Sequence, residues 1–251
     1  MNNKREKPKV AIVMTAFNVS DVLPKTIEEV PRGCADEIFL VDDCSEDNTA
    51  EVAKELGLTV LSHLTNRGYG GAQKTGYLEC IRQDFDVVVL VHGDNQYDPS
   101  QAPLFVSKIL DENYDVVTGT RMIMGDVLSN GMPLWKFLPN RFLTALENMT
   151  FGTELSDYHN GYRAYSVDFL KKVPLELLSE QFDFDTDIII QAAIRRAKIA
   201  EIPHTTRYND ENSQMPFLKG VVYGLSILST VAKYLLHKIG FKKLEMFNIS
   251  R

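Results

Sequence analysis

The chain has 251 residues, of which 44% are hydrophobic and 24% charged, which is typical of a globular protein with a buried core. Its formal charge of −7 argues against a general nucleic-acid binder, because phosphate backbones favour a basic surface, although a divalent cation can join carboxylates to an anionic ligand. We expect a cytoplasmic protein, because the three cysteines lack metal-type spacing and the N-terminus is polar. We expect no spanning helix, because no uncharged apolar run reaches about 18 residues.

In the first half of the chain, short β-branched runs alternate with helical patterns. The runs Val10–Met14 and Val87–Val91 are continuously apolar, as expected of central strands that are covered on both faces. Strands separated by single helices predict βαβ units, so we expect an α/β fold with a mostly parallel sheet flanked by helices. The expected strands are 9–16, 37–43, 58–64, 86–92 and 115–121, and the expected helices are 22–30, 49–56, 71–83 and 101–112.

The second half has a different pattern. The segment 128–153 contains prolines and is expected to be helical from Asn140 onward, and a polar segment follows it. A helix at 186–197 and a strand at 199–208 are expected next. Because no linker rich in Gly, Ser and Pro and no internal repeat interrupts the chain, we expect one domain over residues 1–214.

Residues 215–251 are predicted to begin with one amphipathic helix over about 217–239. Leu218, Val222 and Leu225 begin a series of apolar residues at helical spacing. Two interpretations stay open: the helix packs on its own domain, or it lies on a membrane surface. Lys242 and Lys243, which follow the helix, would favour the second interpretation on anionic lipid.

Acidic side chains follow the second and fourth expected strands. Asp42 and Asp43 are adjacent carboxylates that repel each other, and ligands bind at the carboxyl ends of parallel strands, so a ligand role is predicted. Asp94, with Gln96 and the ring of His92, offers ligands for Mg²⁺ or Mn²⁺. Turn and capping roles explain the other polar residues nearby, which are Asp47, Asn48, Thr49 and Asp98.

A glycine-rich segment, Asn66–Lys74, opens the third expected helix. Glycines let a backbone approach a ligand, and the free N–H groups of a helix start favour an anion. Arg67, Gly68 and Lys74 are therefore predicted to contact a phosphorylated donor, with a plain flexible turn as the alternative. The glycine spacing does not match a dinucleotide fingerprint.

A second polar segment, Ser156–Arg163, holds a carboxylate, an imidazole, an amide and a guanidinium within eight residues. Arg163 and Arg121, which ends the fifth expected strand, could clamp a diphosphate with paired hydrogen bonds. Structural salt bridges are the open alternative for both arginines.

In this order, the segments resemble the family 2 glycosyltransferases of the GT-A fold, in particular the bacterial and archaeal group similar to dolichol-phosphate mannosyltransferase. The resemblance covers roughly residues 9–210. It implies inverting transfer of a sugar from a UDP- or GDP-sugar to a polyprenyl phosphate or glycan, with Mg²⁺ or Mn²⁺, in cell-envelope glycan synthesis at the inner face of the membrane. The matching segments are Val41–Thr49, Asn66–Gly70, His92–Gln96, Gly119–Arg121 and Asp157–Arg163.

The resemblance also implies residue roles. Asp42 and Asp43 would contact the nucleoside, and Asp94 with Gln96 would coordinate the metal. Arg121 and Arg163 would steady phosphates, and Asp157 would orient the acceptor site or assist the acceptor. The remaining members of the implied donor-binding set are Ala16 and Asn18, at the end of the first strand.

The chain departs from the family's pattern at two places. Thr15–Val19 stands where the family reads Pro-Ala-Tyr-Asn-Glu, so the glutamate is absent. His92-Gly93-Asp94 lacks the first acid of the usual Asp-x-Asp motif, which leaves the identity of the metal and strict metal dependence open.

Asp185 and Asp187 are the candidates for a catalytic base. A hydroxyl acceptor would need such a base, whereas a lipid phosphate is already anionic and needs none. Both residues also lie near an expected helix start, where acidic side chains are favoured by the helix dipole.

Two other functions remain as alternatives. A sugar nucleotidyltransferase usually carries a glycine-rich basic loop after its first strand, and Ala16–Asp21 has neither glycine nor a basic residue. The altered His92-Gly93-Asp94 motif leaves room for a catalytically weak partner protein that binds a nucleotide sugar.

Overall fold

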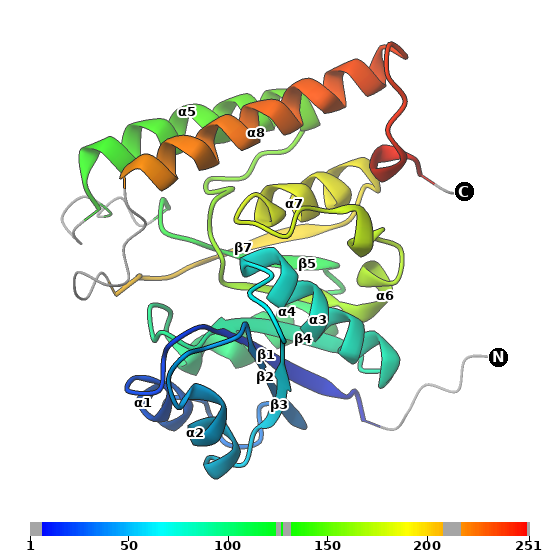
Figure 1. Ribbon diagram of the computed structural model, residues 1–251. Helices are drawn as coiled ribbons and strands as arrows, with labels where there is room; N and C mark the ends of the chain where they lie inside the picture. The colour runs from blue at the N-terminus through cyan, green and yellow to red at the C-terminus, as the bar shows by residue number, and fades with distance from the viewer. Residues whose placement is uncertain (1–6, 124–126, 128–131, 208–216, 250–251) are drawn as a thin grey trace.

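A computed structural model describes residues 7–123, 127, 132–207 and 217–249 of the chain. A seven-stranded sheet forms its centre, with the strand order β3-β2-β1-β4-β6-β5-β7 and helices on both faces (Figure 1). This architecture confirms the predicted α/β fold. The strands are β1 (Val10–Ala16), β2 (Glu37–Asp42), β3 (Thr59–Ser62), β4 (Val87–His92), β5 (Val116–Thr120), β6 (Arg163–Ser166) and β7 (Ile199–Pro203).

The strand β6 is the main departure from the predicted sheet. It pairs antiparallel with β4 and with β5, whereas the other strand pairs are parallel. Its four residues begin with Arg163 and directly follow the polar segment 156–162, so they lack the long apolar run that marks β4. The reversal brings the carboxyl end of β4 next to Arg163 and the segment before it.

The predicted helices are found to within a few residues except at α5, and α6 was not predicted. Pro139 lies inside α5, which already begins at Leu134, because one proline removes one hydrogen bond without ending a helix that packs well. The helices are α1 (Leu23–Glu28), α2 (Thr49–Glu55), α3 (Tyr69–Arg82), α4 (Ala102–Leu110), α5 (Leu134–Phe151), α6 (Val167–Leu170), α7 (Phe184–Ile194) and α8 (Phe217–Lys238), with 3-10 turns η1 (Pro99–Gln101), η2 (Leu175–Leu177) and η3 (Glu245–Phe247).

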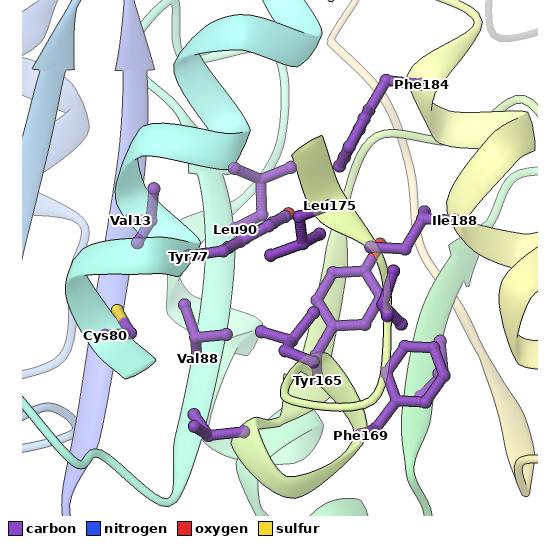
Figure 2. Packing of buried hydrophobic residues seen from close by; sticks show 14 of the residues in the cluster. Val13, Tyr77, Cys80, Val88, Leu90, Tyr165, Phe169, Leu175, Phe184 and Ile188 are labelled. Atoms are coloured by element: carbon purple, nitrogen blue, oxygen red, sulfur yellow. The ribbon is translucent and has the colours of Figure 1, made fainter. Parts of the chain in front are cut away.

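Successive residues of the central strands point to opposite faces, and each face has its own core. On one face Val13, Val88 and Leu90 pack with Tyr77 and Tyr165 (Figure 2). On the other face the alternate strand residues pack with side chains of α4. A Cβ at Gly76 would lie 2.3 Å from Val13, so α3 approaches β1 as closely as glycine allows. The close approach fixes where α3 begins, beside the carboxyl end of β2.

The helices α5 and α8 run side by side at one end of the molecule, away from α1 and α2 (Figure 1). Leu143 of α5 and Ile227 and Val231 of α8 are buried between them, so the predicted C-terminal helix packs on its own domain through one side. Its other side exposes apolar residues. None of the helices in the described part of the chain is both long and apolar enough to cross a bilayer. The exposed apolar side chains include Leu218, Val222 and Leu225 on α8 and Leu138, Phe142 and Met149 on α5.

Candidate active site

Asp43 lies where β2 ends, and its carboxylate holds the glycine-rich loop before α3. Oδ1 accepts the backbone N–H of Arg67 at 2.8 Å, and Oδ2 accepts that of Gly68 at 2.8 Å. Gly68 has φ +86°, and a Cβ there would lie 2.7 Å from the carbonyl oxygen of Glu180, so only glycine fits. Asp43 thus fixes the loop that was predicted to approach the donor.

The ends of β1 and β2 are joined at this edge of the sheet. The backbone N–H of Asp43 donates to the carbonyl oxygen of Ala16 at 2.9 Å. The side-chain oxygen of Asn18 accepts the N–H of Glu46 at 2.8 Å, and Asp42 accepts the N–H of Ser45 at 3.1 Å. The predicted residues Ala16, Asn18, Asp42 and Asp43 are therefore brought together in one place.

The side chains of the two basic residues in the glycine-rich segment, Arg67 and Lys74, point in different directions. Arg67 is half-exposed, and its guanidinium lies 2.6 Å from Glu180. Lys74 is 4% exposed, and its Nζ donates to the carbonyl oxygen of Leu178 at 2.6 Å. Burial lowers the pKa of Lys74. Its ammonium faces the interior and stabilises the loop at residue 178, a position that does not fit the predicted donor contact of Lys74.

Asp94 lies in a tight turn after β4, where Asn95 has φ +57°. Its Oδ1 accepts the N–H of Gln96 at 3.1 Å, and its Oδ2 receives no hydrogen bond from the described residues. No group of three or more His, Cys, Asp or Glu side chains in the described ranges is arranged to hold a metal ion. One open carboxylate oxygen nevertheless fits Mg²⁺ or Mn²⁺, since these ions share their coordination with waters and substrate phosphates.

His92, the third predicted metal ligand, faces an aromatic cluster. Its Nε2 lies 2.9 Å from the hydroxyl of Tyr69, and its ring meets those of Tyr69 and Tyr97 edge-on. Burial lowers the pKa of His92, so the neutral ring is favoured. Because Tyr69 occupies Nε2, the structure does not fit the prediction that His92 coordinates the metal through this nitrogen.

Arg121 and Asp157 form a two-bond ion pair with each other. Nε of Arg121 lies 2.7 Å from Oδ2 and its Nη2 lies 3.0 Å from Oδ1. Asn140 of α5 adds a hydrogen bond to Oδ1 at 3.1 Å. Burial alone would raise the pKa of the Asp157 carboxyl, but the adjacent Arg121 guanidinium holds it well below its usual range. Asp157 therefore anchors Arg121, and its low basicity does not suit proton abstraction.

Arg163 is fully buried, and backbone carbonyl oxygens satisfy its guanidinium. Nε donates to Asn160 at 2.7 Å, Nη1 to Asp185 at 2.6 Å and Nη2 to Tyr158 at 2.7 Å. The side chain joins the segment before β6 to the start of α7. Arg163 does not reach the surface, so its position does not fit the predicted diphosphate clamp of Arg121 and Arg163.

The two predicted bases lie in different surroundings. Asp185 accepts hydrogen bonds from Tyr69 at 3.1 Å and Gln73 at 3.2 Å. Asp187 accepts the N–H of Ser179 at 2.9 Å, while its Oδ1 is buried without a hydrogen-bond partner among the described residues. Burial raises the pKa of Asp187 to about 7. Asp185 is thus connected to the aromatic cluster around His92, and Asp187 to the loop before α7.

Comparison with known proteins identifies the family. A model described as glycosyl transferase family 2 matches residues 11–174. The chain belongs to this family. It is therefore a glycosyltransferase, and its fold is the GT-A fold predicted from the motifs.

Similar proteins of this glycosyltransferase family match over nearly the whole chain. An uncharacterized protein of Methanocaldococcus jannaschii is 31% identical over 90% of this chain and 92% of its own length. UDP-N-acetylglucosamine–dolichyl-phosphate N-acetylglucosaminyltransferase of Methanococcus voltae is 25% identical over 80% of this chain and 86% of its own. In fold, the chain is similar to glucosyl-3-phosphoglycerate synthase of Mycobacterium tuberculosis, solved with Mn²⁺ and UDP (TM-score 0.70, 20% identity, 93% of this chain and 80% of that one).

Three residues of this glycosyltransferase contact the predicted site residues although the sequence motifs did not indicate them. His63 contacts Asp43, and Tyr69 joins His92 to Asp185. Arg207 lies 2.6 Å from both Glu29 and Asn95, and its backbone N–H donates to Gln96 at 2.9 Å. Arg207 lies near the end of the predicted strand 199–208 and four residues after β7 ends at Pro203, and a basic residue at this position was the available signal.

Proposed function

We propose that this glycosyltransferase transfers a sugar from a UDP- or GDP-linked donor to a polyprenyl phosphate, with inversion at the anomeric carbon. The observation that carries the proposal is the shared sheet edge of Asp43 and Asp94. β1 lies between β2 and β4 in the sheet, so the loop held by Asp43 and the open carboxylate oxygen of Asp94 flank the same strand end.

Asp43, with Asp42, would bind the nucleoside, while the loop at Arg67 and Gly68 would border the diphosphate. Asp94, with Gln96, would hold a divalent cation. When bound, Mg²⁺ or Mn²⁺ supplies positive charge for the departing nucleoside diphosphate. The Methanococcus voltae relative, which is named for a UDP-linked sugar and dolichyl phosphate, supports this substrate class.

Arg121 would meet the acceptor phosphate, because Asp157 fixes its guanidinium in one direction. A phosphate acceptor is already anionic and needs no base. A glycan acceptor is the second candidate, and it would lose its hydroxyl proton to Asp185, whose carboxylate is positioned by Tyr69 and Gln73.

The exposed side of α8 would lie on the cytoplasmic face of an anionic membrane, where polyprenyl phosphates are found. Val222 and Leu225 are 66% and 61% exposed, and Lys219 lies beside them in the chain. In this proposal residues 1–214 form the catalytic domain, and the boundary itself lies outside the described residues. Because α8 packs on α5, it would hold the domain at the bilayer.

A liposome experiment tests the membrane contact. We expect the wild type to sediment with phosphatidylglycerol-containing vesicles and Val222→Asp/Leu225→Asp to remain in the supernatant, because two charges would enter the apolar face. Leu104→Asp, at an exposed leucine of α4, is the matched control and should sediment like the wild type. Equal sedimentation of all three proteins would reject the contact.

An activity assay tests the transfer itself. The purified protein is incubated with UDP- and GDP-sugars, short-chain polyprenyl phosphate and Mn²⁺, and the lipid product is identified by mass spectrometry. We expect a polyprenyl-phosphate sugar from one donor. Transfer to a glycan with none to the lipid phosphate would favour the second candidate, and transfer to neither would reject the proposal.

A further inference from the structure

We propose that His63 is a positioning residue for donor recognition, because it fixes which carboxylate oxygen of Asp43 is open to the nucleoside. This inference rests on the proposed donor-binding role of Asp43. The motifs of the sequence do not include His63, which follows the short strand β3.

The imidazole of His63 joins β2 to α3 through both ring nitrogens. Nδ1 lies 2.7 Å from Oδ1 of Asp43, and Nε2 lies 2.8 Å from the hydroxyl oxygen of Thr75 on α3. The backbone N–H of His63 donates to the carbonyl oxygen of Asp42 at 2.9 Å, which places the ring beside the end of β2. Only 8% of the side chain is exposed, so protein contacts rather than water set its orientation.

The hydrogen bonds around Asp43 distinguish its two oxygens. A carboxylate oxygen has two lone pairs that can accept hydrogen bonds. Oδ1 uses both, one for His63 and one for the N–H of Arg67, whereas Oδ2 receives a protein donor only from the N–H of Gly68 among the described residues. The remaining position on Oδ2 therefore suits a donor group of the nucleoside, such as an imide N–H of the base or a ribose hydroxyl.

Without the imidazole, two backbone N–H groups of consecutive residues would hold Asp43, and both belong to the loop itself. Among the described residues, His63 supplies the one anchor of this carboxylate that comes from outside the loop, and its ring is also fixed by Thr75. Thr75 in turn accepts from Nη1 of Arg67 at 3.4 Å. Loss of the contact with His63 would let the Asp43 carboxylate and the loop move together, and the open position on Oδ2 would no longer be fixed.

Two near-isosteric variants separate the contacts of the ring. In His63→Asn the amide nitrogen takes the place of Nδ1, so the contact with Asp43 is kept and that with Thr75 is lost. In His63→Gln the amide reaches the place of Nε2, so the contact with Thr75 is kept and that with Asp43 is lost. Both variants replace a nearly buried ring with a smaller amide, so the two should disturb the packing to a similar extent.

Calorimetry with UDP, GDP and inorganic pyrophosphate, each with Mn²⁺, measures the effect. We expect His63→Gln to raise the Kd of the nucleoside diphosphate that the wild type binds by at least about tenfold, and His63→Asn by less than about threefold, because one charge-assisted hydrogen bond is at stake. The Kd of pyrophosphate should rise less than that of the nucleoside diphosphate, since pyrophosphate lacks the nucleoside and is affected only through the loop at Arg67 and Gly68. A role in folding alone would lower the melting temperature of both variants equally without this difference in Kd.

The two possible failures are distinguishable. Equal Kd values for wild type and His63→Gln, or equal weakening of pyrophosphate and nucleoside diphosphate, would overturn the positioning role and leave the proposed function standing. A wild type that binds neither UDP nor GDP would overturn the proposed function and this inference with it.

Discussion

The acidic side chains at the strand ends of the first half differ from those of the second half. Asp43 accepts the backbone N–H groups of Arg67 and Gly68 and contacts the ring of His63. Asp94 accepts the N–H of Gln96, and among the described residues each of the two carboxylates keeps an oxygen with acceptor capacity. Asp157 is paired with Arg121, Asp185 accepts from Tyr69 and Gln73, and Asp187 is buried.

The difference separates acids that shape a binding site from acids that stabilise the fold. Asp43 and Asp94 each keep acceptor capacity that a ligand can use, although Asp43 is only 5% exposed. A carboxylate inside the protein needs a cation or a proton, because the charged form loses its hydration there. Single substitutions of Asp to Asn at three positions test this division, since they remove a charge and keep the shape.

Asp157→Asn should have the largest effect on stability. It leaves Arg121 partly buried without its counter-charge, and breaking a buried ion pair costs about 3 to 5 kcal/mol of unfolding free energy. Because the pKa of Asp157 is held low, its contribution is present above a pH of about 4 and is lost as the pH falls through its folded pKa. Urea titrations at several pH values measure both effects.

Asp168→Asn is the control, since Asp168 lies on α6 with 88% of its side chain exposed. We expect a change below about 0.5 kcal/mol there. If Asp157→Asn has the same unfolding free energy as this control, Asp157 would be assigned to the acids that shape a binding site rather than to those that stabilise the fold.

Asp94→Asn should leave stability unchanged and remove function. The amide oxygen can still accept the N–H of Gln96, so the turn is kept, but a neutral amide binds Mg²⁺ or Mn²⁺ poorly. We expect transfer activity to fall about 100-fold, in the range seen when electrostatic stabilisation of a leaving group is lost. Steady-state rates and thermal melting curves, both measured with Mn²⁺, test this prediction. A variant that melts at a lower temperature but keeps its transfer activity would contradict it.

Asp187→Asn should change how the stability depends on pH. The folded pKa is raised to about 7 by burial, so stability from the protonated side chain is full below a pH of about 4 and is lost as the pH rises through 7. In the wild type this gives a slope of up to about −1.4 kcal/mol per pH unit in that window. The asparagine variant should flatten the slope, and an unchanged slope would assign the pH dependence to other groups.

The sequence predicted the first half of the molecule well because periodicity and burial agree there. The runs Val10–Met14 and Val87–Val91 became the two central strands, β1 and β4. Those segments bury whole faces, and such burial leaves a clear pattern in the chain.

The segment Ser156–Arg163 shows why the rest could not be predicted. Its carboxylate and guanidinium are the residue types of a phosphate site, but Arg163 serves buried carbonyl oxygens and Asp157 serves Arg121. A guanidinium satisfies backbone oxygens and phosphate oxygens with the same geometry, so residue type alone cannot choose between them. The choice depends on the antiparallel strand β6, which turns Arg163 inward.

Positive charge is concentrated on α8 and the residues that follow it, whereas the rest of the chain is negatively charged. Residues 217–243 contain five lysines and no acidic residue, and subtracting these five charges from the net −7 leaves −12 on the rest of the chain. The chain is therefore a dipole with its positive pole along one helix. Near an anionic surface the field would rotate the molecule before contact, helix first, and this torque would weaken once ionic strength shortens the Debye length below about 8 Å.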